Sequence, residues 1–179
     1  MIVALAGRRI DAPHSEVERF PERCAETVRE RLRAALLDAG ASTLVSAAAC
    51  GADLIALTAA EELGLRRHII IPSSIEDFRA HSVVDRPGDW GPIFDRLVSE
   101  AQTTGDLEII NVPETGSAAY LKVNAEILER ATIIARDAHE PLGAFAIWDG
   151  PLIGRTDYTQ DFVETAQKRG VLVRSIGII

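Results

Sequence analysis

The stretch Thr43-Leu-Val-Ser-Ala-Ala-Ala-Cys-Gly-Ala-Asp53 contains the transition that decides the fold. It begins as a short apolar run, which is typical of a buried strand, and continues through small residues. From residue 52 an apolar, alanine-rich segment follows to residue 63 and predicts a helix that ends at Gly64. A buried strand that leads through a short loop into a helix is the repeating unit of parallel α/β sheets.

The same alternation extends over the whole chain. We predict strands at residues 2–6, 43–47, 68–71, 107–112, 143–148 and 171–176. We predict helices at residues 21–39, 52–63, 75–80, 92–101, 118–135 and 158–169. This order, with right-handed crossovers, predicts one α/β domain over residues 1–179, a Rossmann-like three-layer sandwich with a mostly parallel central sheet. Ligands of such sheets bind outside the carboxyl ends of the strands.

Composition narrows the class of protein. The formal net charge is −8 and the pI about 5.0, which argues against a nucleic-acid partner. No apolar run approaches the ~18–20 residues that span a bilayer, and the first residues are typical of a strand and not of a signal peptide. We therefore expect a cytoplasmic protein with no membrane partner. Two cysteines and four scattered histidines offer no metal-ligand spacing, so we expect neither a metal nor a cofactor.

Three loops at the predicted ligand edge carry unusual residues. The first, Gly7-Arg8-Arg9, follows strand 2–6, where glycine permits a tight turn and two arginines face the ligand edge. An ordinary surface loop with two arginines is the alternative. The G-x-G-x-x-G and G-x-x-x-x-G-K-[ST] phosphate motifs are absent from the sequence.

The second loop joins strand 43–47 to the next helix. Its candidate ligand-binding residues are Ala48, Cys50, Gly51, Ala52 and Asp53. Small residues let a ligand approach the backbone, and free N–H groups at the start of the helix favour an anion. Alternatively, Asp53 only stabilises the start of the helix, and the alanines only permit close packing. A small buried thiol is the expected state of Cys50.

The third loop runs from strand 143–148 into the last helix. Its candidates are Asp149, Gly150, Gly154, Arg155, Thr156 and Asp157. Glycines, an arginine, a hydroxyl and carboxylates together suit a phosphate-and-ribose site. Asp157 followed by Gln160 also resembles a capping box, so we expect Asp157 to cap the helix and to contact the ligand.

Two further features lie outside these loops. Asn124 interrupts the apolar stripe of helix 118–135, either as a satisfied core amide or as a ligand contact. The segment 75–102, with Asp77, Arg79, Arg86 and Trp90, forms either a lid that selects the ligand or a surface elaboration that packs Phe78, Trp90 and Phe94 on the core.

The run Ser46-Ala-Ala-Ala-Cys-Gly-Ala-Asp53, continued by an alanine-rich helix, resembles the SLOG superfamily of Rossmannoid domains. The resemblance extends to Gly7-Arg8-Arg9, to Asn124 and to the turn from Asp149 to Asp157. It implies a phosphate and ribose cradle made by residues 51–53 and 154–157, with a nucleotide-derived ligand.

Within this superfamily, the LOG phosphoribohydrolases cleave the N-glycosidic bond of nucleoside monophosphates with an arginine and a glutamate. Their P-G-G motif is absent here, and Thr159 stands where the glutamate falls, which leaves Asp157 as a shorter substitute and Arg155 as the positive charge. We therefore expect binding or sensing of a nucleotide-derived small molecule: an ADP-ribose-like compound, a cyclic nucleotide or a nucleoside phosphate.

Two alternatives stay open. One is a LOG-like N-glycosidase with Asp157 or Asp53 as its catalytic carboxylate. The other is an oligomerisation or adaptor domain without a ligand. In each case we expect a homo-oligomer, a dimer, for which helix 118–135 is the candidate interface.

Overall fold

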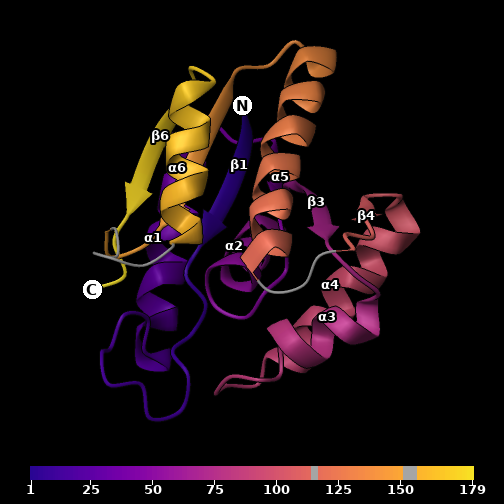
Figure 1. Ribbon diagram of the computed structural model, residues 1–179. Coiled ribbons are helices and arrows are strands. Elements are labelled where there is room, and N and C mark those ends of the chain that lie inside the picture. Colours follow the sequence, from indigo (N-terminus) through magenta and orange to yellow (C-terminus); the bar gives the residue numbers. More distant parts are fainter. Residues whose placement is uncertain (114–116, 151–156) are drawn as a thin grey trace.

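The computed structural model describes residues 1–113, 117–150 and 157–179, and Figure 1 shows its arrangement. The strands are β1 (Ile2–Gly7), β2 (Thr43–Ser46), β3 (Arg66–Ile71), β4 (Leu107–Ile109), β5 (Leu142–Ile147) and β6 (Leu172–Ile176). The helices are α1 (Ala25–Asp38), α2 (Ala52–Glu62), α3 (Ile75–Ser82), α4 (Trp90–Thr104), α5 (Ser117–Ala138) and α6 (Tyr158–Lys168), and a 3-10 turn, η1 (Glu22–Cys24), precedes α1. Every paired strand is parallel to its neighbour, which confirms the predicted α/β class.

The helices cover both faces of the sheet. Side chains of α1, α2 and α4 pack on the face that presents Val3 and Leu5. The opposite face, which presents Ile2 and Ala4, packs against α5 and α6. Figure 1 shows α5 and α6 side by side over this face. The apolar stripe of α5 is thus buried against the sheet of the same chain.

The strand order is β4-β3-β2-β1-β5-β6. From β1 the chain runs outward through β2, β3 and β4, and it then returns to place β5 and β6 on the other side of β1. The order therefore reverses between β1 and β5, and such a switch point leaves a crevice at the carboxyl ends of the two strands. The first and third predicted loops both begin at this place.

Several boundaries differ from the predicted ones. Strand β4 ends at Ile109 and not at residue 112, because it pairs only with β3, whose last residue, Ile71, lies opposite Ile109. Helix α4 begins at Trp90 and α5 continues to Ala138, so both are longer than their apolar periodicity predicts.

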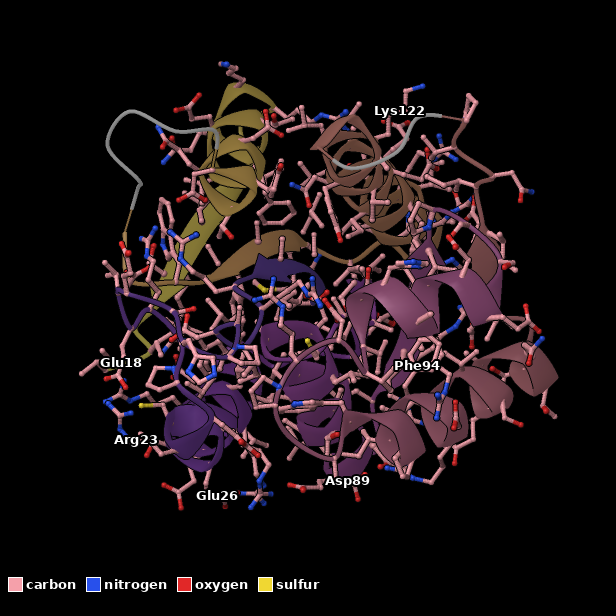
Figure 2. All side chains as sticks on the ribbon, turned by 60° about the horizontal axis from the view of Figure 1, so that its bottom comes forward. Glu18, Arg23, Glu26, Asp89, Phe94 and Lys122 are labelled. Carbon is pink, nitrogen blue, oxygen red and sulfur yellow. The ribbon has the colours of Figure 1, made fainter. Side chains whose placement is uncertain are left out.

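The segment between β3 and β4 packs on the core, as one of the two alternatives predicts. Phe78 and Phe94 stack with their ring centroids 6.0 Å apart, and Trp90 is buried beside them. Phe94, labelled in Figure 2, is fully buried. In the parts of the chain that the structure describes, no helix is both long and apolar enough to cross a membrane.

Candidate functional site

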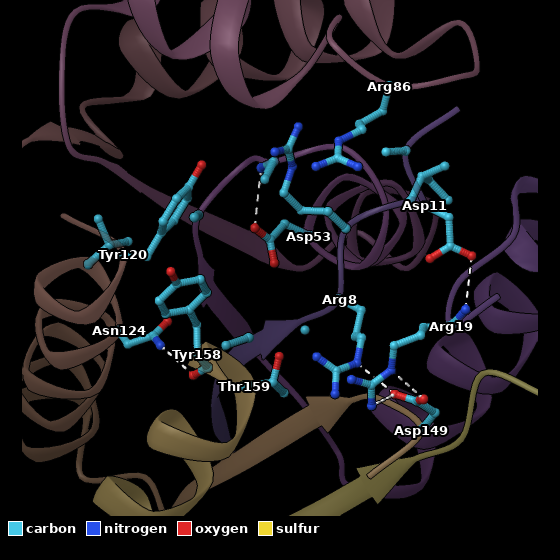
Figure 3. A pocket seen from close by; sticks show the side chains of 18 of the residues that line it. Arg8, Asp11, Arg19, Asp53, Arg86, Tyr120, Asn124, Asp149, Tyr158 and Thr159 are labelled. Carbon is cyan, nitrogen blue, oxygen red and sulfur yellow. Dashed lines mark hydrogen bonds and ion pairs between the residues drawn. The ribbon is translucent and has the colours of Figure 1, made fainter. Parts of the chain in front are cut away.

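A cavity of about 1020 Å³ opens at the switch point, at the carboxyl ends of β1, β2 and β5 (Figure 3). Its walls come from the loop after β1, the start of α2, the first half of α5 and the start of α6. Its charged lining residues are Arg8, Arg9, Arg19, Arg86, Asp11, Glu16, Asp53 and Asp149. A cavity of this size and place is typical of a small-molecule site in an open α/β sheet.

A network of guanidinium and carboxylate groups forms one end of the cavity. Arg8 donates from Nε to Asp149 Oδ1 at 2.6 Å and from Nη2 to Asp157 Oδ2 at 2.6 Å. Arg19 donates to both oxygens of Asp149 at 2.7 Å. Both arginines also donate to the carbonyl of Gly150. Although burial opposes the effect, the hydrogen bonds from Arg19 and Arg8 lower the pKa of Asp149, so this end holds ionised, mutually paired groups.

Asp157 caps α6, which confirms the predicted capping role. Its Oδ1 accepts hydrogen bonds from the N–H groups of Thr159 at 3.0 Å and Gln160 at 3.1 Å. Its Oδ2 faces Arg8, and the side chain is completely buried. Asp157 does not line the cavity. Its carboxylate therefore holds the loop after β1 to the start of α6. Of the two predicted catalytic candidates, Asp157 and Asp53, only Asp53 lines the cavity.

The start of α2 differs from the expected anion site. The N–H of Ala52 donates to the carbonyl of Arg8 at 3.0 Å, and that of Leu54 points to the carbonyl of Ala49 at 3.3 Å. The chain itself thus occupies donors that we expected to be free. Gly51 permits this approach: its φ is +98°, and a Cβ there would lie 2.7 Å from the nitrogen of Ile10. We expected a ligand to approach the backbone at this glycine, but the loop after β1 occupies that place.

Asp53 lies at the cavity wall, with Arg9 near enough to influence its charge. The residue is 8% exposed, and one carboxylate oxygen accepts a 3.2 Å hydrogen bond from the N–H of Ala49. Burial raises the pKa of Asp53 to about 7, against the opposing effects of the Ala49 hydrogen bond and the Arg9 charge. A carboxyl group in this state exchanges protons near neutral pH.

A second basic cluster lies at another part of the rim. Arg9 forms an ion pair with Asp85, and its Nη2 lies 3.5 Å from Cys50 Sγ. Arg86 Nε lies 3.4 Å from the other oxygen of Asp85. Burial raises the pKa of the Cys50 thiol despite Arg9, so Cys50 is a neutral, buried thiol, as the sequence predicts.

Two tyrosines from different helices line the cavity and pack against each other. The rings of Tyr120 and Tyr158 lie 5.3 Å apart between centroids, at an interplanar angle of 35°. Asn124 lies beside them (Figure 3), and its Nδ2 donates to the carbonyl of Tyr158 at 2.8 Å. Asn124 therefore fits both predicted alternatives, because its amide is satisfied internally and still lines the cavity.

The loop between β1 and η1 is ordered by Asp11. Its carboxylate accepts from the N–H groups of Arg19 at 2.9 Å and Phe20 at 3.0 Å. Phe20 is fully buried, whereas Glu18 and Arg23 form an exposed ion pair at the edge of the molecule (Figure 2). This anchoring brings Arg19 to the cavity from a loop without periodicity.

The structure thus sorts the predicted site residues. Those that line the cavity are Gly7, Arg8, Arg9, Asp53, Asn124 and Asp149. Those that do not line it are Ala48, Cys50, Gly51, Ala52, Gly150 and Asp157. Gly154, Arg155 and Thr156 fall outside the described residues. Sequence reasoning gave no site role to Asp11, Arg19, Tyr120 or Tyr158, and it considered Thr159 only as the residue at the position of the LOG glutamate.

Among the described residues, no three histidine, cysteine, aspartate or glutamate side chains gather as metal ligands would.

No family model matches the sequence, and no curated protein is similar to it. The structure is similar to the X-ray structure of DNA processing protein A (DprA) from Streptococcus pneumoniae, with a TM-score of 0.45 and 15% sequence identity. That comparison covers 96% of this chain and 57% of the DprA chain.

Proposed function

We propose that this protein binds a phosphorylated, nucleotide-derived small molecule in the cavity at the switch point. One observation carries the proposal: a cavity of about 1020 Å³ lies where parallel sheets bind ligands, and four arginines line it. Guanidinium groups bind phosphate in a forked geometry, which makes arginine the expected residue for such a ligand.

The remaining lining residues suit the other parts of a nucleotide. The Tyr120 and Tyr158 rings offer aromatic surface for a base, and Thr159 and Asn124 offer polar groups for a ribose. An adaptor domain without a ligand would instead have a closed edge. The SLOG resemblance of the sequence supports a nucleotide-derived ligand in the same place.

A thermal-shift screen tests this proposal. The panel is AMP, ADP, ADP-ribose, cyclic AMP and NAD. A compound at ~100 times its Kd stabilises the fold by about 2.7 kcal/mol, which raises Tm by several degrees for a chain of this size. Sucrose at the same concentration controls for nonspecific stabilisation. If none of the five compounds raises Tm, the proposal fails for this class of ligand.

Asp53 favours a second candidate function, hydrolysis of an N-glycosidic bond. A buried carboxyl group with a pKa near 7 can protonate the leaving base as its bond to C1′ breaks. The carboxylate then takes a proton from the water that adds to C1′, which restores the neutral acid and gives the free base and a ribose phosphate. This role belongs to Asp53 and not to Asp157, whose oxygens face Arg8 and the α6 backbone.

The two functions differ in one measurable product. Each nucleotide mixture is analysed by chromatography for free base, with the wild-type chain and with Asp53→Asn. Stabilisation without free base supports binding alone. Free base that disappears in Asp53→Asn, while the variant still binds, supports the N-glycosidase. Equal release by both chains would exclude Asp53 as the general acid.

A further inference from the structure

The four arginines of the cavity fall into two pairs with different charge balance. Arg8 and Arg19 lie at one end and share two carboxylates, those of Asp149 and Asp157. Each guanidinium also donates to the carbonyl of Gly150. Among the described residues, two positive and two negative charges meet there, so these groups leave little net charge to attract an anion.

The other pair has a surplus of positive charge. Arg9 and Arg86 share one carboxylate, that of Asp85, within the described part of the chain. The Arg86 contact is long, 3.4 Å from Nε to Oδ2, and it belongs to adjacent residues. The Arg9 Nη2 contact with the Cys50 thiol adds no negative charge, since the thiol is neutral. Among the described ion-paired groups, this end therefore has two guanidinium charges against one carboxylate, and Asp53, whose pKa is about 7, is only partly ionised at neutral pH.

Unused donors lie at the same place. Arg9 Nε is buried and has no hydrogen-bond partner among the described residues. The same holds for Arg19 Nη1 at the other end, so the two ends differ in charge balance and not in the presence of a spare donor. The Arg9 side chain is only 21% exposed, so water satisfies its Nε poorly. Figure 3 shows Arg86 pointing into the pocket from the rim opposite Arg8, Arg19 and Asp149. Two convergent guanidinium groups with spare donors match the several acceptor oxygens of a phosphate.

We propose that Arg9 and Arg86 form the phosphate subsite of the cavity, and that Asp85 holds the two guanidinium groups together until a phosphate takes its place. This inference rests on the proposed function and adds where the phosphate binds. Asp85 is one-third exposed and does not line the cavity, so its carboxylate can turn to solvent when it is displaced. The subsite also lies on the Asp53 side of the cavity, because Arg9 acts electrostatically on that carboxyl group.

The subsite makes opposite predictions for two neighbouring substitutions. Asp85→Asn removes a competing negative charge, so pyrophosphate binds about fivefold more tightly. Arg86→Gln removes half of the subsite, so pyrophosphate binds at least tenfold more weakly. Arg79→Gln is the matched control: Arg79 is also an arginine in an ion pair, with Asp95, but it does not line the cavity. This control changes affinity less than twofold. Arg19→Gln tests the opposite end of the cavity as the competing phosphate subsite.

Isothermal titration with inorganic pyrophosphate and with AMP, at constant ionic strength, measures all five chains. Circular dichroism and Tm establish that each variant is folded. Weaker binding in Arg86→Gln together with tighter binding in Asp85→Asn supports the subsite. Wild-type affinity in Arg86→Gln, or loss of binding in Arg19→Gln alone, overturns the subsite and leaves the proposed function standing. A wild-type chain that binds neither probe and none of the other nucleotides of the panel overturns both.

Discussion

The two carboxylate oxygens of Asp157 contact different elements: Oδ1 accepts hydrogen bonds from the N–H groups of Thr159 and Gln160 in α6, and Oδ2 accepts one from Nη2 of Arg8 at 2.6 Å. Arg8 follows β1 and Asp157 follows β5, so this one side chain joins the two loops that flank the switch point. Asp157 thus holds the two loops together although it does not itself line the cavity. Several consequences can be measured.

Removal of the Asp157 side chain should lower the free energy of unfolding more than removal of its charge alone. Asp157→Ala loses a helix cap, which costs ~1 kcal/mol, and leaves Arg8 without a buried partner, for a total of about 3 kcal/mol. Asp157→Asn keeps a capping oxygen and should cost about 1–2 kcal/mol. Urea unfolding at pH 7 measures both. Equal losses in the two variants would show that the cap contributes nothing.

Gly51→Ala tests the contact between the loop after β1 and the start of α2. The new Cβ would meet the backbone of Ile10 at 2.7 Å and of Arg8 at 2.8 Å, at a φ of +98°. We expect the free energy of unfolding to fall by about 3 kcal/mol or more. Gly64→Ala is the control, because its φ is also positive and nothing lies within 4 Å, so it should lose only about 1 kcal/mol. Similar losses at both positions would contradict the close contact.

Asp53 should make stability depend on pH between about 4 and 7. Its pKa is raised from 3.8 to about 7 in the folded chain, so within this window the folded state binds a proton that the unfolded state has lost. The unfolding free energy therefore falls as pH rises through the window, by about 4 kcal/mol in total at 1.36 kcal/mol per pH unit.

Asp53→Asn keeps an acceptor for the Ala49 N–H and removes the titration. The difference in unfolding free energy between the variant and the wild type should thus grow in favour of the variant from pH 4 to pH 8. Chemical unfolding at five pH values measures this difference, and effects of all other groups cancel in it. A difference that stays constant across the range would show that Asp53 has an ordinary pKa.

The sheet could be predicted from the sequence because its strands are continuous apolar runs separated by periodic helices. Residues 43–63 illustrate this, since a buried strand, a loop of small residues and a helix follow one another without interruption. Boundaries were less predictable where a partner strand sets them, as Ile71 does for the end of β4. The residues of β4 alone do not indicate where the partner strand ends.

The candidate site could be predicted only where it follows a strand. Arg8, Arg9 and Asp149 follow β1 and β5 directly, so the topology alone brings them to the ligand edge. Arg19 reaches the cavity through a loop that Asp11 anchors, and no periodicity indicates that anchor. The prediction of a free N–H group at Ala52 was wrong for a similar reason. The carbonyl that accepts its hydrogen bond belongs to Arg8, 44 positions earlier in the chain.

Substitution of Tyr120 should weaken the binding of nucleotides but not of simple phosphates. Tyr120→Leu removes one ring of the pair that faces the cavity, and stacking of a base on a ring contributes about 1–3 kcal/mol. We expect AMP affinity to fall about tenfold and pyrophosphate affinity to stay unchanged. Tyr120→Phe keeps the ring and should bind AMP as the wild type does. Isothermal titration of both probes checks this, and a parallel loss of pyrophosphate binding would indicate a general collapse of the cavity.

The most direct test of the account is a crystal structure of the chain with the panel compound that raises Tm most. The account predicts electron density in the switch-point cavity, with the phosphate at Arg9 and Arg86 and the base toward Tyr120. Density for the compound elsewhere on the molecule, with the cavity empty, would contradict the central claim.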